Sequence, residues 1–335
     1  MRVPEITNQE SGKAMKFGIH IGLPYTTPSE AKDLAQHIED LNFGWISIFD
    51  HMYSSNGTSD RHCLEAVAMH SFLASVTRRV RVGCLVYVAG YRPAGTLAKS
   101  IATMDHISGG RITLGLGAGW NRREFSSFGL PFLPPADRSR QLEEYVQAVR
   151  ALLTNDGPVS FHGAHFSLEG AVCEPQPVQR RLPIWIGGTG EHRTLPMTAR
   201  LADGWNAPFL SPEAFAKKRA VLAAACELVG RDISEITCSV NLGLAWSEES
   251  LVSQYGRRAD EVREATLFGS PDEMRDLVDR YRDAGADQLN ISLRAGASQR
   301  YEGRAHDFAG LTRLAEVLPL ASSTPLTGTS TGMNA

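Results

Sequence analysis

Cysteine is scarce in this 335-residue sequence, with five residues scattered at positions 63, 84, 173, 226 and 238. Their number is odd and no pair has the spacing of a zinc site, which indicates a reduced, cytoplasmic protein without a disulfide framework. Asp60, His62 and Cys63 are three potential metal ligands within four residues. So compact a set rarely meets one ion without distant partners, and we therefore expect no bound metal.

Charge of one sign and long apolar runs are also absent. The 34 basic and 37 acidic residues give a net charge of −3, which indicates no general affinity for nucleic acid. No apolar run approaches the roughly 18–20 residues of a membrane span. Residues 1–14 lack the apolar core of a signal peptide. We expect a cytoplasmic protein that binds neither nucleic acid nor membrane, and the apolar fraction of 42% is ample for a core.

Three common catalytic signatures are missing. No Gly-x-Ser-x-Gly elbow is present, so serine-hydrolase chemistry has no support. No glycine-rich segment continues into Gly-Lys-Ser or Gly-Lys-Thr, which excludes a P-loop. Gly115 and Gly117 begin a glycine pattern, but Trp120 stands where the dinucleotide-binding fingerprint needs its third glycine.

Strand-like and helix-like patterns alternate from residue 16 onward. The predicted strands cover residues 16–21, 45–49, 80–86, 112–116, 183–186, 204–207, 236–244 and 288–292. Eight strand–helix units in about 300 residues predict an α/β fold, a (β/α)₈ TIM barrel over residues 15–320. Residues 1–14 and 321–335 are expected to be flexible. The alternative is a doubly wound sheet, which would more often carry a phosphate fingerprint after its first strand.

Two segments interrupt this rhythm. Residues 155–182 contain VSFHGAHFSL, which predicts a small hairpin with a His-Gly turn. Residues 246–269 are charged, and we expect them to lie over the mouth of the barrel. With the loops at 52–62 and 121–137, they are the predicted insertions at the C-terminal face, where long connections are usually functional.

In a TIM barrel the site lies at the C-terminal ends of the strands. His51 follows the second strand and is the first candidate for an acid–base group, because imidazole titrates near neutral pH and Asp50 beside it supplies negative charge. Adjacent strand residues point to opposite faces, which leaves open whether the two side chains touch. His20 follows the first strand and competes for the same role, its alternative being a satisfied core histidine.

Glycines end two of the predicted strands. Gly117 and Gly119 follow the fourth strand, where the missing Cβ lets the backbone approach a ligand. The loop Gly187–Gly190 with Thr189 stands between a strand and a helix, which favours a phosphate cradle over an ordinary turn. Three tryptophans at strand ends either stack on a flat ring or fill the barrel: Trp120, Trp185 and Trp205.

Several segments carry a resemblance in their order and spacing. They are FDH at 49–51, RPAGTLAKS at 92–100, TMDHISGGRITLGLGAGW at 103–120, NRREFSSFGLPF with Glu124, FHGAHF at 161–166, PIWIGGTGEHRT at 183–194 and LADGWNAP at 201–208. Together they resemble the bacterial-luciferase-like family of flavin and deazaflavin oxidoreductases over roughly residues 15 to 320. AVCEPQPVQ and IGGTGEHRT are most similar to a branch that uses the deazaflavin coenzyme F420.

The resemblance implies a cofactor, F420 or FMN, in the barrel mouth with its ribityl phosphate on the loop 187–190. It also implies a non-prolyl cis peptide at Leu85–Val86. The cofactor contacts that it implies are Asp50, Leu85, Val86, Gly117, Gly119, Glu124, Gly187, Gly188, Thr189 and Gly190. The acidic oligoglutamate tail of F420 would meet basic groups, and three candidates are Arg92, Lys99 and Arg193.

With F420 the expected reaction is hydride transfer with a small organic substrate; with FMN, reduced by a separate reductase, it is monooxygenation. A non-catalytic flavin-binding protein is an alternative of another class. A phosphate-substrate lyase has less support, because the lysines considered for a Schiff base, Lys99, Lys217 and Lys218, fall in helices. Homodimers are frequent in the family, and the apolar helix 64–76 with Met69, Phe72 and Leu73 suggests an interface.

Overall fold

The structure, a computed structural model, describes residues 14–54, 62–293 and 303–320. Apart from Ala14, the terminal segments predicted to be flexible lie outside these residues. Eight parallel strands form the barrel: β1 (Lys16–Ile21), β2 (Trp45–Ile48), β3 (Arg81–Val88), β4 (Ile112–Gly117), β7 (Ile184–Gly187), β8 (Gly204–Pro208), β9 (Thr237–Leu244) and β11 (Gln288–Leu293). β9 pairs with both β8 and β11, which closes the sheet into a ring. This closure confirms the TIM barrel and excludes the doubly wound alternative.

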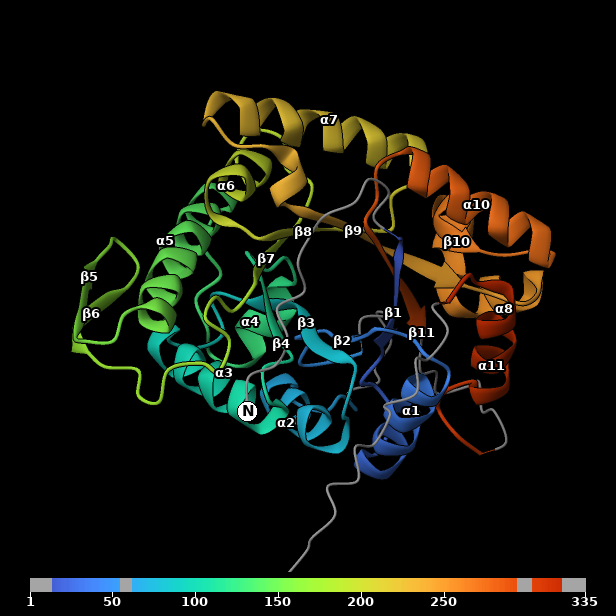
Figure 1. Ribbon diagram of the computed structural model, residues 1–335, viewed down its shortest axis with the longest axis horizontal. Helices are drawn as coiled ribbons and strands as arrows, with labels where there is room; N and C mark the ends of the chain where they lie inside the picture. Colours follow the sequence, from blue (N-terminus) through green and yellow to red (C-terminus); the bar gives the residue numbers. More distant parts are fainter. Residues whose placement is uncertain (1–13, 55–61, 294–302, 321–335) are drawn as a thin grey trace, which may run out of the picture.

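Helices surround the ring of strands (Figure 1). They are α1 (Pro28–Asp40), α2 (Ala66–Val76), α3 (Ala94–Ser108), α5 (Pro135–Thr154), α6 (Thr194–Leu201), α7 (Pro212–Leu228), α10 (Pro271–Asp283) and α11 (Phe308–Val317). α1 shows why these segments become helices. Pro28 occupies the first turn, and the Thr27 side chain accepts a hydrogen bond from the Glu30 backbone N–H. Its buried stripe, which follows the i, i+3, i+4, i+7 spacing, comprises Ala31, Leu34, Ala35 and Ile38.

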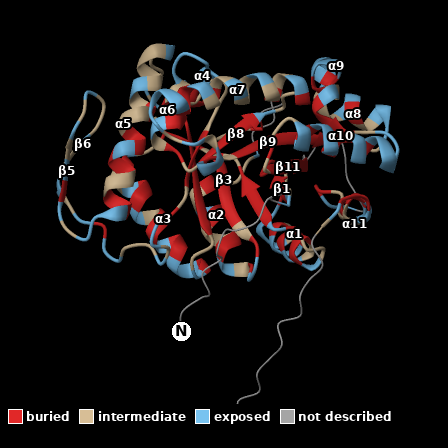
Figure 2. Cartoon of the chain, turned by 45° about the horizontal axis from the view of Figure 1, so that its top comes forward, coloured by how far each residue is buried: buried red, intermediate tan, exposed pale blue. Residues whose placement is uncertain are grey.

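Helices on the outside leave the strands buried on both faces (Figure 2). Inside the barrel, Trp45 stacks on Trp185 with ring centroids 5.0 Å apart. Glycines on neighbouring strands make room for this pair: a Cβ on Gly83 would lie 2.7 Å from Trp45, and one on Gly204 would lie 2.5 Å from Trp185. The barrel is therefore a packed core at this level, with Trp185 filling it.

The other two tryptophans have different surroundings. Trp205 packs against Phe215 of α7, with centroids 5.1 Å apart. Trp120 is 66% exposed at the end of β4, so it alone of the three is available to a ligand at the mouth.

The two insertions lie at opposite ends of the barrel. β5 (Val159–His162) and β6 (Ser167–Ala171) form the predicted hairpin, which projects beyond α5 in Figure 1. It follows α5, so it stands at the N-terminal end of the strands. Residues 246–269 contain α8 (Glu248–Tyr255), α9 (Ala259–Val262) and β10 (Thr266–Leu267). Because β10 pairs with Gly243 and Leu244, this insertion packs beside the C-terminal end of β9.

The apolar stripe of α2 packs within the chain. Met69 and Leu73 are buried in the main core, and Phe72 is half-buried against it. Barrel packing thus accounts for this stripe without a partner subunit. None of the helices in the described ranges combines the length and apolar character that crossing a membrane requires.

Candidate functional site

A buried carboxylate, that of Glu124, connects three strand ends at the mouth of the barrel. It lies in α4 (Arg122–Ser127), a short helix after β4. His51 donates to it from Nδ1 at 2.9 Å, and the Tyr91 hydroxyl donates at 2.7 Å. The backbone N–H groups of Met52 and Tyr53 add hydrogen bonds of 3.1 and 3.4 Å. These donors follow β2 and β3, so one side chain holds three loops together.

Burial opposes ionisation of Glu124, but the hydrogen bond and charge of His51, with the Tyr91 hydroxyl, lower the pKa of Glu124 below its ordinary value. The ionised carboxylate only accepts hydrogen bonds, so Nδ1 of His51 carries a hydrogen. Nε2 of His51 has no hydrogen-bond partner among the described residues and is the ring's free nitrogen. Phe49 and Trp120 lie edge-on to the ring, at centroid distances of 5.2 and 5.7 Å.

Asp50 has partners of its own. Arg92 binds it through two hydrogen bonds of 2.6 and 2.9 Å, and the Val88 backbone N–H donates at 2.9 Å. Asp50 therefore does not supply the charge beside His51, as the sequence suggested. The two side chains leave the chain on opposite sides, and the carboxylate on His51 comes from Glu124, 73 residues away. Arg92 also contacts Glu65 at 3.2 Å, so its charge is already matched within the chain.

The peptide bond Leu85–Val86 is cis, as the resemblance implied. The Val86 side chain lies over the ends of β4 and β7. A Cβ on Gly187 would stand 2.7 Å from Val86 Cγ1, and one on Gly117 would come closer still to Cγ2. Both glycines thus make room for Val86, which accounts for them through packing as well as through the predicted ligand contact. Leu85 is buried with the stacked tryptophans, and Val86 packs against the same cluster.

The loop after β7 presents backbone N–H groups near the start of α6. The N–H of Gly188 donates to the Asn206 carbonyl at 3.0 Å and is therefore occupied. The N–H groups of Thr189 and Gly190 have no acceptor within the described part of the chain. No side chain caps the start of α6 at Thr194. An anion could be held by these N–H groups and the Thr189 hydroxyl, which suits the predicted phosphate cradle.

His20 is buried, and its Nδ1 lies 2.9 Å from the Ser47 hydroxyl. On the neighbouring strands β8, β9 and β11, side-chain amides form a network that sequence reasoning did not connect. Asn241 Oδ1 accepts from Asn206 Nδ2 at 2.9 Å and from Asn290 Nδ2 at 3.3 Å. Each of the three asparagines lies within a predicted strand, and this shared position was the available signal.

The candidate metal ligands have other roles. His62 Nδ1 accepts a hydrogen bond from the Tyr25 backbone N–H at 3.0 Å, and the Cys63 thiol donates to the His51 carbonyl at 3.3 Å. Asp60 lies outside the described residues. Burial, with the nearby charges of Glu124 and Asp50, raises the pKa of Cys63 to about 12. The Cys63 thiol is thus protonated at neutral pH and is a poor nucleophile.

The family model described as luciferase-like monooxygenase matches residues 9–259. A protein of Mycobacterium tuberculosis named Rv0953c is 38% identical over 132 residues, which cover 39% of this chain and 45% of that protein. An FMNH2-dependent dimethylsulfone monooxygenase of Pseudomonas putida is 29% identical, over 51% of this chain and 46% of that enzyme. This chain thus spans about half the length of the curated relatives it matches.

A solved structure shares the fold. An F420-dependent secondary alcohol dehydrogenase, in complex with an F420–acetone adduct, superimposes with a TM-score of 0.79 at 17% sequence identity. The similarity covers 92% of this chain and 99% of that one, so the whole barrel is common to both.

We predict that Glu124→Gln lowers the free energy of unfolding at neutral pH, because it removes the charge that the surrounding donors stabilise. The folded-state pKa of Glu124 is lowered, so its contribution is present above the ordinary value of 4.5 and is lost as pH falls through the folded-state pKa. Urea denaturation between about pH 7 and about pH 3 should show a difference from the parent that narrows with acidification. Glu249→Gln, at an exposed position, is the control, and a difference independent of pH would contradict the prediction.

Proposed function

Since the chain belongs to the luciferase-like monooxygenase family, we propose that it is an oxidoreductase that transfers a hydride between coenzyme F420 and a small organic substrate. One observation carries the chemical part of this proposal. His51 is oriented by the buried Glu124 carboxylate at the C-terminal end of the barrel, and its Nε2 has no hydrogen-bond partner among the described residues. This is the arrangement of a general acid–base group whose orientation is fixed by a second residue.

The residues around this pair suit a flavin-type cofactor. Val86, backed by Gly117 and Gly187, offers an apolar wall at the strand ends. Thr189 and Gly190 offer the phosphate backbone N–H groups that donate to no acceptor in the described ranges. The carboxylates of Asp50 and Glu124 are fully engaged within the chain, so we assign them to support of this wall and of His51 rather than to direct contact with the cofactor.

When bound, F420 supplies or accepts the hydride, and proton movement is left to the chain. Nε2 of His51 accepts the proton of a substrate hydroxyl during oxidation and returns it to the oxygen during reduction. The Glu124 carboxylate stabilises the imidazolium that forms, because it accepts the Nδ1 hydrogen at 2.9 Å. Tyr91 and the two backbone N–H groups keep that carboxylate in place.

A second candidate function is an FMN-dependent monooxygenase that receives reduced flavin from a separate reductase. The similarity to the Pseudomonas putida enzyme favours it, and the same loop would hold the FMN phosphate. The reduced flavin would then supply the oxygen chemistry, and His51 would remain the acid–base group beside it. A binding protein without catalytic activity would share the cofactor site but would not turn over any substrate.

We predict that Gly188→Asp abolishes cofactor binding, because the carboxylate would stand beside the phosphate-binding N–H groups. Gly188 has φ +128°, so any side chain there is strained. Gly188→Ala shares this strain without the charge and is the matched control. Equilibrium titration with F420 should show a much greater loss for the aspartate variant. Unchanged affinity in a folded Gly188→Asp protein would remove the loop from the site.

We predict that His51→Ala reduces turnover by about 10²–10⁴-fold while the fold and most cofactor affinity remain. Steady-state rates and a separate cofactor titration measure the two effects. His162→Ala, on the exposed hairpin, is the control and should leave the rate unchanged. If the His51 variant loses less than about threefold, His51 only lines the site and His20 becomes the acid–base candidate.

A further inference from the structure

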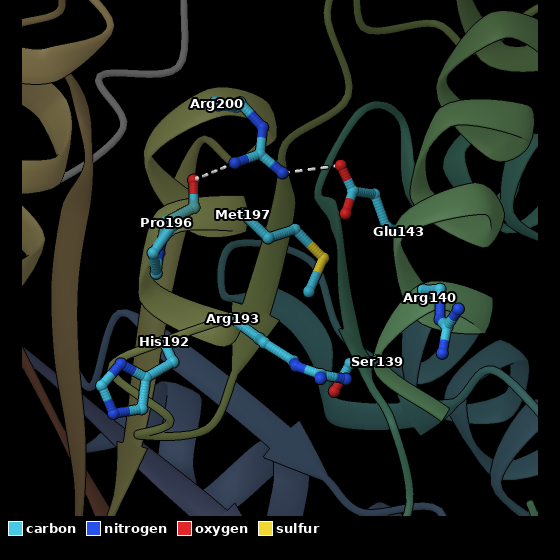
Figure 3. Close-up of a pocket in the computed structure, with 8 residues that line it drawn as sticks. All are labelled: Ser139, Arg140, Glu143, His192, Arg193, Pro196, Met197 and Arg200. Atoms are coloured by element: carbon cyan, nitrogen blue, oxygen red, sulfur yellow. Dashed lines mark hydrogen bonds and ion pairs between the residues drawn. The ribbon is translucent and has the colours of Figure 1, made fainter. Parts of the chain in front are cut away.

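A basic pocket lies between α5 and α6 on the rim of the proposed cofactor site. Its volume is about 430 Å³, and it is lined by Ser139, Arg140, Glu143, His192, Arg193, Pro196, Met197 and Arg200 (Figure 3). The chain runs directly from the glycine loop 187–190 into this pocket, because His192 and Arg193 follow the loop after one residue. A ligand bound on the loop therefore has the pocket beside it.

Positive charge in this pocket exceeds what the chain itself neutralises. Glu143 is engaged by Arg200 at 2.6 Å, and Arg200 also donates to the Pro196 carbonyl at 3.3 Å. Glu191, the acid nearest in sequence, is bound by Lys218 at 2.6 Å and does not compensate the pocket. Among the described residues, this leaves Arg193 as the arginine of the pocket whose charge a ligand can neutralise.

Arg193 is the residue that the pocket leaves unpaired. No carboxylate in the described ranges forms an ion pair with it, whereas Arg140 has an exposed contact of 2.9 Å to Asp137. Figure 3 shows the Arg193 side chain extending from the start of α6 toward Ser139 on α5. A guanidinium in this position presents several donors to an incoming carboxylate or phosphate oxygen.

We propose that this pocket binds the carboxylates of a flexible polyanionic chain attached to the cofactor through its phosphate. The oligoglutamate tail of F420 has this chemistry, so the inference rests on the proposed function and deepens it. With the phosphate on Thr189 and Gly190, a tail that continues past it enters the space between α5 and α6. FMN ends at its phosphate and leaves the pocket unused, so the pocket favours the deazaflavin over FMN.

The proposal is tested by fluorescence titration with F420 that carries several glutamates and with the same cofactor shortened to none. At low ionic strength the long-tailed form should bind roughly tenfold or more tightly, because hydrogen bonds to charged groups are the strong ones. Added salt should lower the ratio of the two affinities, because the pocket is open to solvent and its charges are screened. Arg193→Glu should bring the ratio of the two affinities close to one. Arg257→Glu, the same charge reversal on an exposed residue after α8, should leave that ratio unchanged.

The ratio isolates the tail, because any effect of the substitution on phosphate binding is common to both cofactor forms. Equal affinity for the two forms in the parent protein would overturn this inference and leave the proposed function standing. A ratio that Arg193→Glu does not change would also overturn it. Binding of FMN without binding of either F420 form would overturn the proposed function and this inference together.

Discussion

The carboxylate of Glu124 is fully buried between the ends of β2, β3 and β4, and the arrangement around it depends on keeping that charge satisfied. Burying an anion without hydrogen-bond partners destabilises the fold, so the loops that follow these strands must place their hydrogen-bond donors around the Glu124 carboxylate. The same requirement fixes the hydrogen on Nδ1 of His51 and directs Nε2 outward. Asp50 meets the requirement separately, through Arg92 and the Val88 N–H. The carboxylates of Glu124 and Asp50 can thus both be buried at the mouth of the barrel because each has its own hydrogen-bond donors.

The barrel beneath gives these groups a rigid base. Trp45 and Trp185 fill the interior because glycines on neighbouring strands leave them room. Above them, the Val86 side chain uses the space left by Gly117 and Gly187. Gly117 and Gly187, which the sequence predicted as ligand contacts, are therefore required by side-chain packing as well. A ligand at the strand ends would meet a close-packed wall on one side and the free N–H groups of the loop 187–190 on the other.

Periodicity was sufficient for most of the fold, because a barrel strand buried on both faces and a helix with one apolar stripe leave clear patterns. The first strand was predicted to the residue at 16–21. The short helix α4 was missed, since six residues cannot display a helical stripe. The partner of His51 was missed for a different reason: its contact with Glu124 spans 73 residues, and only the closed barrel brings their loops together. The local sequence favoured Asp50 as the partner of His51, but the side chains of these adjacent residues point to opposite faces of the chain.

We propose that the mouth of the barrel holds a deazaflavin cofactor beside His51. Titration of the purified protein with F420 and with FMN, each followed by fluorescence under the same buffer and salt, tests it most directly. The account predicts saturable binding of F420 with an affinity at least about tenfold higher than that for FMN, which is a difference of about 1.4 kcal/mol. Higher affinity for FMN, or no saturable binding of F420, would contradict it.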